Sequence, residues 1–164
     1  MEKYTFFWQT KSPFSNWHGS LFTYKGQIFK NSEAAFMWEK AILFDDQKIA
    51  KIILFNQDPR TVKSLGRKVK NFDNKVWDDK KFNIMFEVNL EKFKQCNHCK
   101  KALLEAEGKF VEASPFDKVW GIGMSENEPG VEDEANWKGE NLLGLVLDKV
   151  KDNIVALKDF ESKL

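Results

Sequence analysis

Glu33 and Lys40 lie seven residues apart in the helix-like stretch SEAAFMWEKAIL. Seven residues make nearly two helical turns, so both side chains project from one face, roughly 10 Å apart along the axis. Phe36, Met37 and Ala41 make this face apolar, and desolvation there disfavours the ammonium form of a lysine. The neutral amine is a nucleophile toward a carbonyl carbon. A lysine whose stem covers the edge of a core face gives the same pattern, and spacing alone favours that structural alternative.

The segment VEASPFDKVWGIG, residues 111–123, combines three useful chemistries. Asp117 offers a carboxylate, Trp120 a stacking surface, and Gly121 a backbone that a ligand can approach closely. This combination suits a nucleotide or a sugar. A tryptophan that fills the core, beside glycines that serve turns, explains the pattern equally well. The triplet GIG lacks the spacing and the βαβ context of a dinucleotide-binding fingerprint.

Arginine is rare in this chain, where only Arg60 and Arg67 stand among 26 basic residues. Arg67 follows Gly66, where a short helix is predicted to end, and its planar guanidinium suits bidentate phosphate recognition. The alternative is a solvated basic face, because Lys63 and Lys68 lie close by in the sequence.

Two asparagines lie beside tryptophan or glycine near predicted element boundaries. Asn16 and Trp17 belong to SNW, and Asn141 belongs to WKGENLLG. Ligand binding and simple capping or turn chemistry both remain open for these residues.

Metal and histidine chemistry are poorly supported. Cys96 and Cys99 have C-x-x-C spacing, but no second ligand pair exists, so we expect reduced cysteines and no metal site. Only His18 and His98 are available as imidazole bases. If the protein is an enzyme, carboxylates and lysine should therefore carry the proton transfers.

The composition predicts one globular domain over residues 1–164. The chain is 42% hydrophobic and contains fifteen Phe and six Trp, enough for a core of its own. A net charge of +1 argues against a broad basic surface for nucleic acid. No run approaches the roughly 18 apolar residues of a membrane span, and the first residues lack a signal-peptide pattern, so we expect a soluble, cytoplasmic protein.

Short strands and several helices must position the candidate residues. The predicted strands cover residues 4–8, 21–24, 27–29 and 110–113. The predicted helices begin after Asn31 or Ser32, at Asp45, at Pro59, at Asp73, at Ala102 and at Asn141. The long helix ends at Gln95 and the final helix at Leu157. The predicted fold class is α+β and mainly α-helical.

Together, these stretches resemble one known family. The motifs are SNW, SEAAFMWEKA, P-x-x-V-K-x-L-G-R-K-V, NIMFEVNLEKF, VEASPFDKVWGIG and W-x-G-x-N-x-L-G. In this order and spacing they are similar to the NADAR family, also called YbiA-like. The resemblance covers about residues 5–155, and residues 156–164 resemble a polar C-terminal tail.

The resemblance implies a mainly helical fold that hydrolyses N-glycosidic bonds. It implies either removal of ADP-ribose from ADP-ribosylated guanine, in nucleic acid or nucleotides, or hydrolysis of riboflavin-pathway intermediates. A non-catalytic module that binds ADP-ribose or an NAD metabolite is a third possibility, and a fold does not choose among them. The Lys40-Ala41 dipeptide resembles the branch associated with ADP-ribose.

The resemblance also implies roles for individual residues. Lys40 would form a Schiff base, Glu33 would be the acid and Asp117 the base. The expected substrate-binding residues are Asn16, Trp17, Arg67, Trp77, Trp120, Gly121 and Asn141, of which Arg67 is assigned from its guanidinium chemistry. No metal, cofactor, membrane or obligate protein partner is implied.

Overall fold

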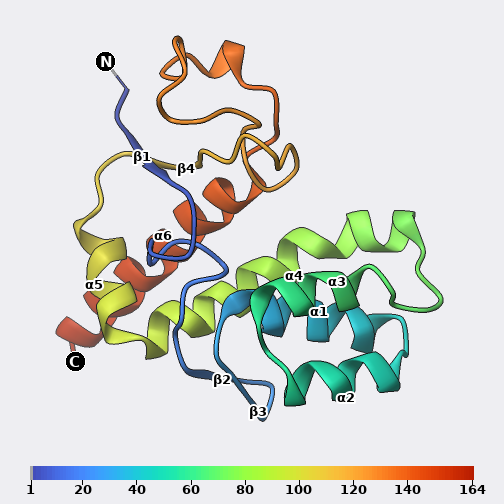
Figure 1. Ribbon diagram of the computed structural model, residues 1–164. Coiled ribbons are helices and arrows are strands. Elements are labelled where there is room, and N and C mark those ends of the chain that lie inside the picture. Colours follow the sequence, from blue (N-terminus) through green and yellow to red (C-terminus); the bar gives the residue numbers. More distant parts are fainter. Residues whose placement is uncertain (1) are drawn as a thin grey trace. The chain divides into compact units, whose positions relative to one another are not determined.

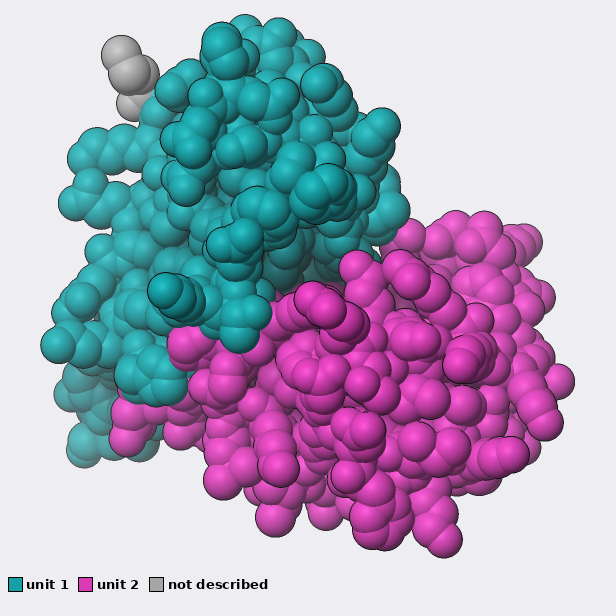
Figure 2. Space-filling view, in the orientation of Figure 1, with its two compact units in different colours: residues 1–15, 98–164 teal, residues 16–97 magenta. Residues whose placement is uncertain are grey.

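The computed structural model describes residues 2–164, which form two compact units (Figure 2). One unit is Asn16–Asn97. The other combines the N-terminal segment through Ser15 with His98–Leu164. The single domain expected from the sequence remains a prediction, and each unit is described by itself.

The unit Asn16–Asn97 is built around one helix (Figure 1). This central helix, α1 (Ser32–Leu43), packs against all three other helices of the unit. Those helices are α2 (Gln47–Phe55), α3 (Pro59–Gly66) and α4 (Asn74–Gln95). An antiparallel hairpin of β2 (Phe22–Tyr24) and β3 (Gln27–Phe29) packs against α4, α1 and α2.

Each helix of this unit begins at an asparagine or aspartate cap. The side chains of Asn31, Asp46, Asp58 and Asp73 accept a backbone N–H from three residues further on. Such bonds satisfy donors that the first helical turn leaves without partners. The prediction that Asp45 opens the second helix is wrong, because Asp45 lies before the cap with φ 56° and Asp46 is the capping residue.

The other unit contains a two-stranded parallel sheet. β1 (Tyr4–Phe7) pairs with β4 (Lys109–Glu112), in a register that places Tyr4 opposite Lys109. This unit also contains α5 (Asn97–Glu105) from His98 onward, the 3-10 turn η1 (Glu134–Asn136) and α6 (Leu142–Ser162). α6 packs against β4 (Figure 1).

Polar side chains from α6 and its N-cap cover the free edge of β4. Asp148 Oδ1 accepts the Phe110 N–H at 3.0 Å. Asn141 Oδ1 accepts the Glu112 N–H at 3.0 Å, and its Nδ2 donates to the Phe110 carbonyl at 3.0 Å. An exposed strand edge invites pairing with other chains, and these bonds satisfy the edge within the unit.

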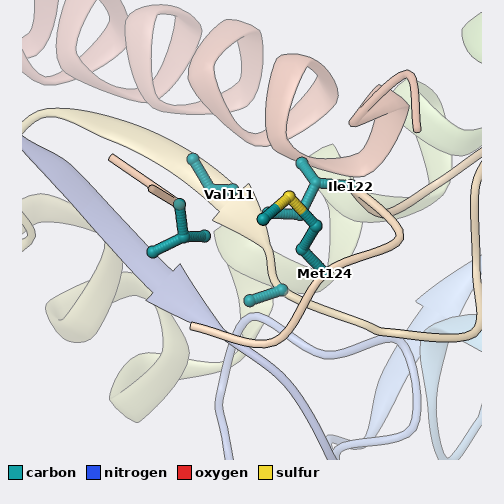
Figure 3. Close-up of a cluster of buried hydrophobic side chains, with 5 residues drawn as sticks. Val111, Ile122 and Met124 are labelled. Carbon is teal, nitrogen blue, oxygen red and sulfur yellow. The ribbon is translucent and has the colours of Figure 1, made fainter. Parts of the chain in front are cut away.

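A small apolar core holds both ends of the segment that follows β4. Val111 lies before this segment, and Ile122 and Met124 lie after it (Figure 3). All three are buried, together with Ala113 and Val131. Their packing fixes the loop of residues 114–121 between two anchored ends.

The predicted mainly helical α+β class is confirmed, although several strand ends differ from the expected ones by one residue and two helices differ by more. α5 begins at Asn97, earlier than the expected Ala102, and contains the buried Cys99. α6 continues to Ser162, so much of the expected polar tail is helical, although its side chains are exposed. Across residues 2–164, no helix has both the length and the apolar character needed to span a membrane.

Candidate functional site

Lys40 lies in the last turn of α1 and is half-buried. Its Nζ donates to the Gly66 carbonyl at 2.9 Å, at the end of α3. The same nitrogen lies 4.7 Å from the Phe72 ring centroid and 5.4 Å from the Trp77 ring centroid. One carbonyl and two aromatic rings therefore surround the amine.

The aromatic rings near Lys40 form a connected group. Trp77 contacts Phe36 at 5.1 Å and Phe44 at 6.5 Å between ring centroids. Phe44 in turn contacts Phe72 at 5.3 Å. We call these four rings, with Lys40 and Gly66, the Lys40 site.

Burial lowers the pKa of Lys40 from its ordinary value, and the negative charge of Glu33 partly opposes this shift. The lowered pKa increases the fraction of neutral amine near pH 7 relative to an exposed lysine. The faces of the Phe72 and Trp77 rings attract the ammonium form and so also oppose this shift. The environment predicted from the apolar helix face is therefore present.

A buried amide network fixes the start of α1, where Glu33 lies. The Glu33 N–H donates to the Asn16 carbonyl at 3.0 Å. The Asn89 side chain donates to Asn16 Oδ1 at 3.4 Å and to the Met85 carbonyl at 3.0 Å. Ser32 Oγ donates to Asn89 Oδ1 at 3.4 Å. Asn16 thus positions the backbone of Glu33, and Trp17 follows it half-buried.

The end of α3 contributes two groups near Lys40. Gly66 supplies the carbonyl, and the exposed Arg67 follows directly. A Cβ at Gly66 would meet the end of the Met37 side chain, so a larger residue there would force that flexible side chain to move.

In the other unit, Asp117 organises the loop that follows β4. Its Oδ1 accepts the N–H groups of Val119 at 2.9 Å and Trp120 at 2.8 Å. Ser114 Oγ accepts the N–H groups of Phe116 at 3.2 Å and Asp117 at 3.1 Å. Both N–H groups that Asp117 accepts are bound by Oδ1. The other oxygen, Oδ2, can therefore accept a proton from a ligand or a water.

Gly121 and Asn141 both have structural tasks in this unit. A Cβ at Gly121 would lie 2.9 Å from the carbonyl oxygens of Asp117 and Glu112. The Gly121 carbonyl accepts the Asn141 N–H at 3.1 Å. Asn141 is buried, with φ 54° and its side chain bonded to β4. The roles in substrate binding expected for these two residues remain predictions.

The structure divides the expected site residues into two groups. Lys40, Arg67 and Trp77 gather around the end of α3, with Asn16 and Glu33 at the start of α1. Four residues of this group had no predicted contact in the site: Phe44, Gly66, Phe72 and Asn89. For Asn89, a polar residue within an apolar helical stripe was the available signal. The ring contacts of Phe72 with Lys40 had no signal in the sequence.

The other group belongs to the second unit. Asp117 and Trp120 share one turn, and Gly121 is joined to Asn141. The Trp120 carbonyl also accepts the Leu143 N–H at 3.0 Å, which ties the loop to the start of α6.

Comparison with known proteins identifies relatives over most of the chain. The NADAR domain matches residues 6–155. Protein irg-1 of Caenorhabditis elegans is 42% identical over 137 residues, which are 82% of this chain and 65% of that protein. The chain thus spans somewhat less than two thirds of that relative. N-glycosidase R617 of Acanthamoeba polyphaga mimivirus is 42% identical over 125 residues, 76% of this chain and 74% of that protein.

A solved structure has the same fold. The NMR structure of the E. coli protein YbiA matches with a TM-score of 0.77 and 25% identity, over 96% of this chain and 88% of that one. This match confirms the YbiA-like fold expected from the sequence motifs.

Proposed function

Because this chain belongs to the NADAR domain family, we propose that it hydrolyses N-glycosidic bonds and that its substrate is ADP-ribose joined to guanine. The name N-glycosidase carried by the mimivirus and bacterial relatives supports the reaction type. The guanine-linked substrate rests on the resemblance of the Lys40-Ala41 dipeptide to the ADP-ribose branch.

The environment of Lys40 carries this proposal. A lysine whose pKa is lowered by burial is a better nucleophile near neutral pH than an exposed one. Its bond to the Gly66 carbonyl and the rings of Phe72 and Trp77 hold the amine in one place. A module that only binds ADP-ribose has no need of a desolvated amine.

The first half of the proposed reaction transfers the ribose to the enzyme. The Lys40 amine attacks the anomeric carbon, and the bond from this carbon to the guanine nitrogen breaks. Glu33 gives its proton to the departing guanine. The Lys40 nitrogen, now bonded to the anomeric carbon, passes a proton to the ring oxygen as the ribose ring opens. This step leaves a protonated Schiff base on Lys40.

The second half releases ADP-ribose. Water adds to the imine carbon and loses a proton to a carboxylate, for which the sequence predicts Asp117. The same proton returns to the Lys40 nitrogen as the C–N bond breaks and its electron pair stays on nitrogen. The hydroxyl proton then restores Glu33 through solvent, so the net reaction consumes one water.

Substrate binding is assigned by the chemistry of the available groups. Arg67 would bind the pyrophosphate, since a guanidinium suits bidentate contact with phosphate oxygens. Trp77 would stack a base, because its ring is only partly buried at the Lys40 site. The contributions of Asn16, Trp17, Trp120, Gly121 and Asn141 to binding remain predictions.

A direct substrate comparison tests the reaction. The protein is incubated with an oligonucleotide bearing ADP-ribosylated guanine and, in parallel, with a phosphoribosyl intermediate of the riboflavin pathway. Mass spectrometry should detect release of ADP-ribose from the first. Cleavage of the second alone would overturn the ADP-ribose assignment and favour the riboflavin alternative.

Lys40→Ala tests the nucleophile. Turnover should fall by about 1,000-fold or more, as expected for loss of a nucleophile, while ADP-ribose binding survives. Lys40→Arg should be equally inactive, because a guanidinium stays protonated. Lys63→Ala, an exposed lysine on α3, is the matched control and should retain activity. Borohydride added during turnover should trap an ADP-ribosyl adduct on the peptide that contains Lys40; normal turnover by Lys40→Ala would exclude this mechanism.

A further inference from the structure

Two aromatic side chains outside the expected site form an exposed pair in the unit that contains Asp117. Trp8 and Phe116 have ring centroids 5.9 Å apart, with an interplanar angle of 52°. Trp8 is 38% exposed and Phe116 is 84% exposed. A phenylalanine this exposed contributes little to the core, and the feature of interest at Phe116 is its ring contact with Trp8.

The fold places this pair at one end of the parallel sheet. Trp8 directly follows β1, and Phe116 follows β4 after a short turn. Because the two strands are parallel, both residues leave the same carboxyl end of the sheet. Phe116 also directly precedes Asp117, so the pair adjoins the predicted active-site loop.

Hydrogen bonds fix the backbone that carries Phe116. Its N–H donates to Ser114 Oγ, and the next residues are held by Asp117 Oδ1. A ring presented by a bonded turn loses little conformational entropy when a ligand stacks on it. The backbone that carries Phe116 is therefore held by hydrogen bonds, and its ring contacts that of Trp8.

We propose that Trp8 and Phe116 form a stacking platform for the adenine of the ADP-ribosyl group, an inference that rests on the proposed function. Stacking on aromatic rings binds bases without hydrogen-bond readout. The Phe116 ring is 84% exposed, so a flat base can reach its face from solvent. Only one lysine, Lys118, lies in residues 114–121, which fits one nucleotide better than a strand with several phosphates.

Variants of Phe116 test this platform by titration calorimetry with ADP-ribose. Phe116→Ala should weaken binding about tenfold, as expected for loss of one base–aromatic stack. Phe116→Trp should retain the affinity because it keeps an aromatic face. Trp8→Leu should weaken binding to a similar extent. The matched control is Phe55→Ala, which removes an 82%-exposed phenylalanine from α2 and should leave the affinity unchanged.

A second ligand isolates the adenine. Ribose 5-phosphate, measured in competition with ADP-ribose, should bind equally well to the wild type and to Phe116→Ala, because it has no base. Unchanged ADP-ribose affinity in Phe116→Ala would overturn the platform. If Phe116→Ala bound an unmodified oligonucleotide more weakly but ADP-ribose normally, the adenine assignment would be wrong. The pair would then stack on a base of the nucleic-acid strand.

These outcomes differ from a failure of the proposed function. If the wild type neither cleaves the ADP-ribosylated oligonucleotide nor binds ADP-ribose, the proposed function itself is wrong. If the wild type cleaves this substrate and Phe116→Ala binds ADP-ribose normally, only the platform is wrong.

Discussion

The Asn141→Ala variant should lower the free energy of unfolding by about 3 kcal/mol. The substitution removes the acceptor of the Glu112 N–H and the donor to the Phe110 carbonyl. A buried backbone group left without a partner costs about 1–3 kcal/mol, with the lower figure for Glu112, which is only partly buried. Alanine also tolerates φ 54° less well than asparagine, by about 1 kcal/mol. The free energy of unfolding of a typical domain is only about 5–15 kcal/mol, so this loss would be large.

Chemical denaturation followed by circular dichroism measures this loss. The matched control is Asn153→Ala on the same helix, because Asn153 is exposed and its side chain donates only to the Lys149 carbonyl. The control should change stability by less than about 0.5 kcal/mol. A loss below about 1 kcal/mol for Asn141→Ala would refute the structural role. Reduced ADP-ribose affinity in the still-folded variant would support its expected role in substrate binding.

Two further predictions concern ionisation. Burial raises the pKa of Asp148 in the folded protein above its value in the unfolded chain. The free energy of unfolding therefore falls as pH rises from the lower of these two values through the higher. Asp148→Asn should therefore be more stable than the wild type at pH 7. The difference in the free energy of unfolding should be less than about 1 kcal/mol, because the carboxyl group is half-exposed, and it should vanish near pH 3. An equal difference at both pH values would contradict this prediction. Trp77→Leu should admit water to Lys40 and move the pKa of the lysine toward its ordinary value of 10.5. The rising limb of the pH–rate profile should therefore shift to higher pH. The shift should be smaller in Trp77→Phe. An unchanged profile would remove Trp77 from the control of Lys40.

The helices of the unit Asn16–Asn97 were largely predictable because their signals are local. Asn31, Pro59 and Asp73 start helices by bonds or ring geometry that involve only their near neighbours. Local signals did not distinguish Asp46 from Asp45 as the capping residue of α2. Asp46 also accepts the Lys70 N–H at 2.9 Å, a bond between segments well separated in the sequence.

The parallel pairing of β1 with β4 was beyond sequence reasoning for the same reason. It joins Tyr4 to Lys109, and the edge of β4 is completed by side chains from α6 and its cap. Neither strand is long enough to reveal its partner by pattern alone. The candidate residues of the Lys40 site were predictable as types, but the ring of Phe72 near the amine depends on tertiary packing.

The contacts of Lys40 also bear on how a lysine in this site keeps its lone pair available. A neutral amine has two N–H groups and one lone pair, and the bond to the Gly66 carbonyl uses only an N–H. That bond therefore leaves the lone pair of the neutral amine available. The rings of Phe72 and Trp77 shield part of the amine from water and have no acidic proton to give to its nitrogen. Glu33, the carboxyl whose charge acts on Lys40, lies nearly two turns away on the same helix, which separates the proposed acid from the proposed nucleophile. Because both groups belong to one rigid helix, their separation is set by backbone geometry rather than by loop conformation.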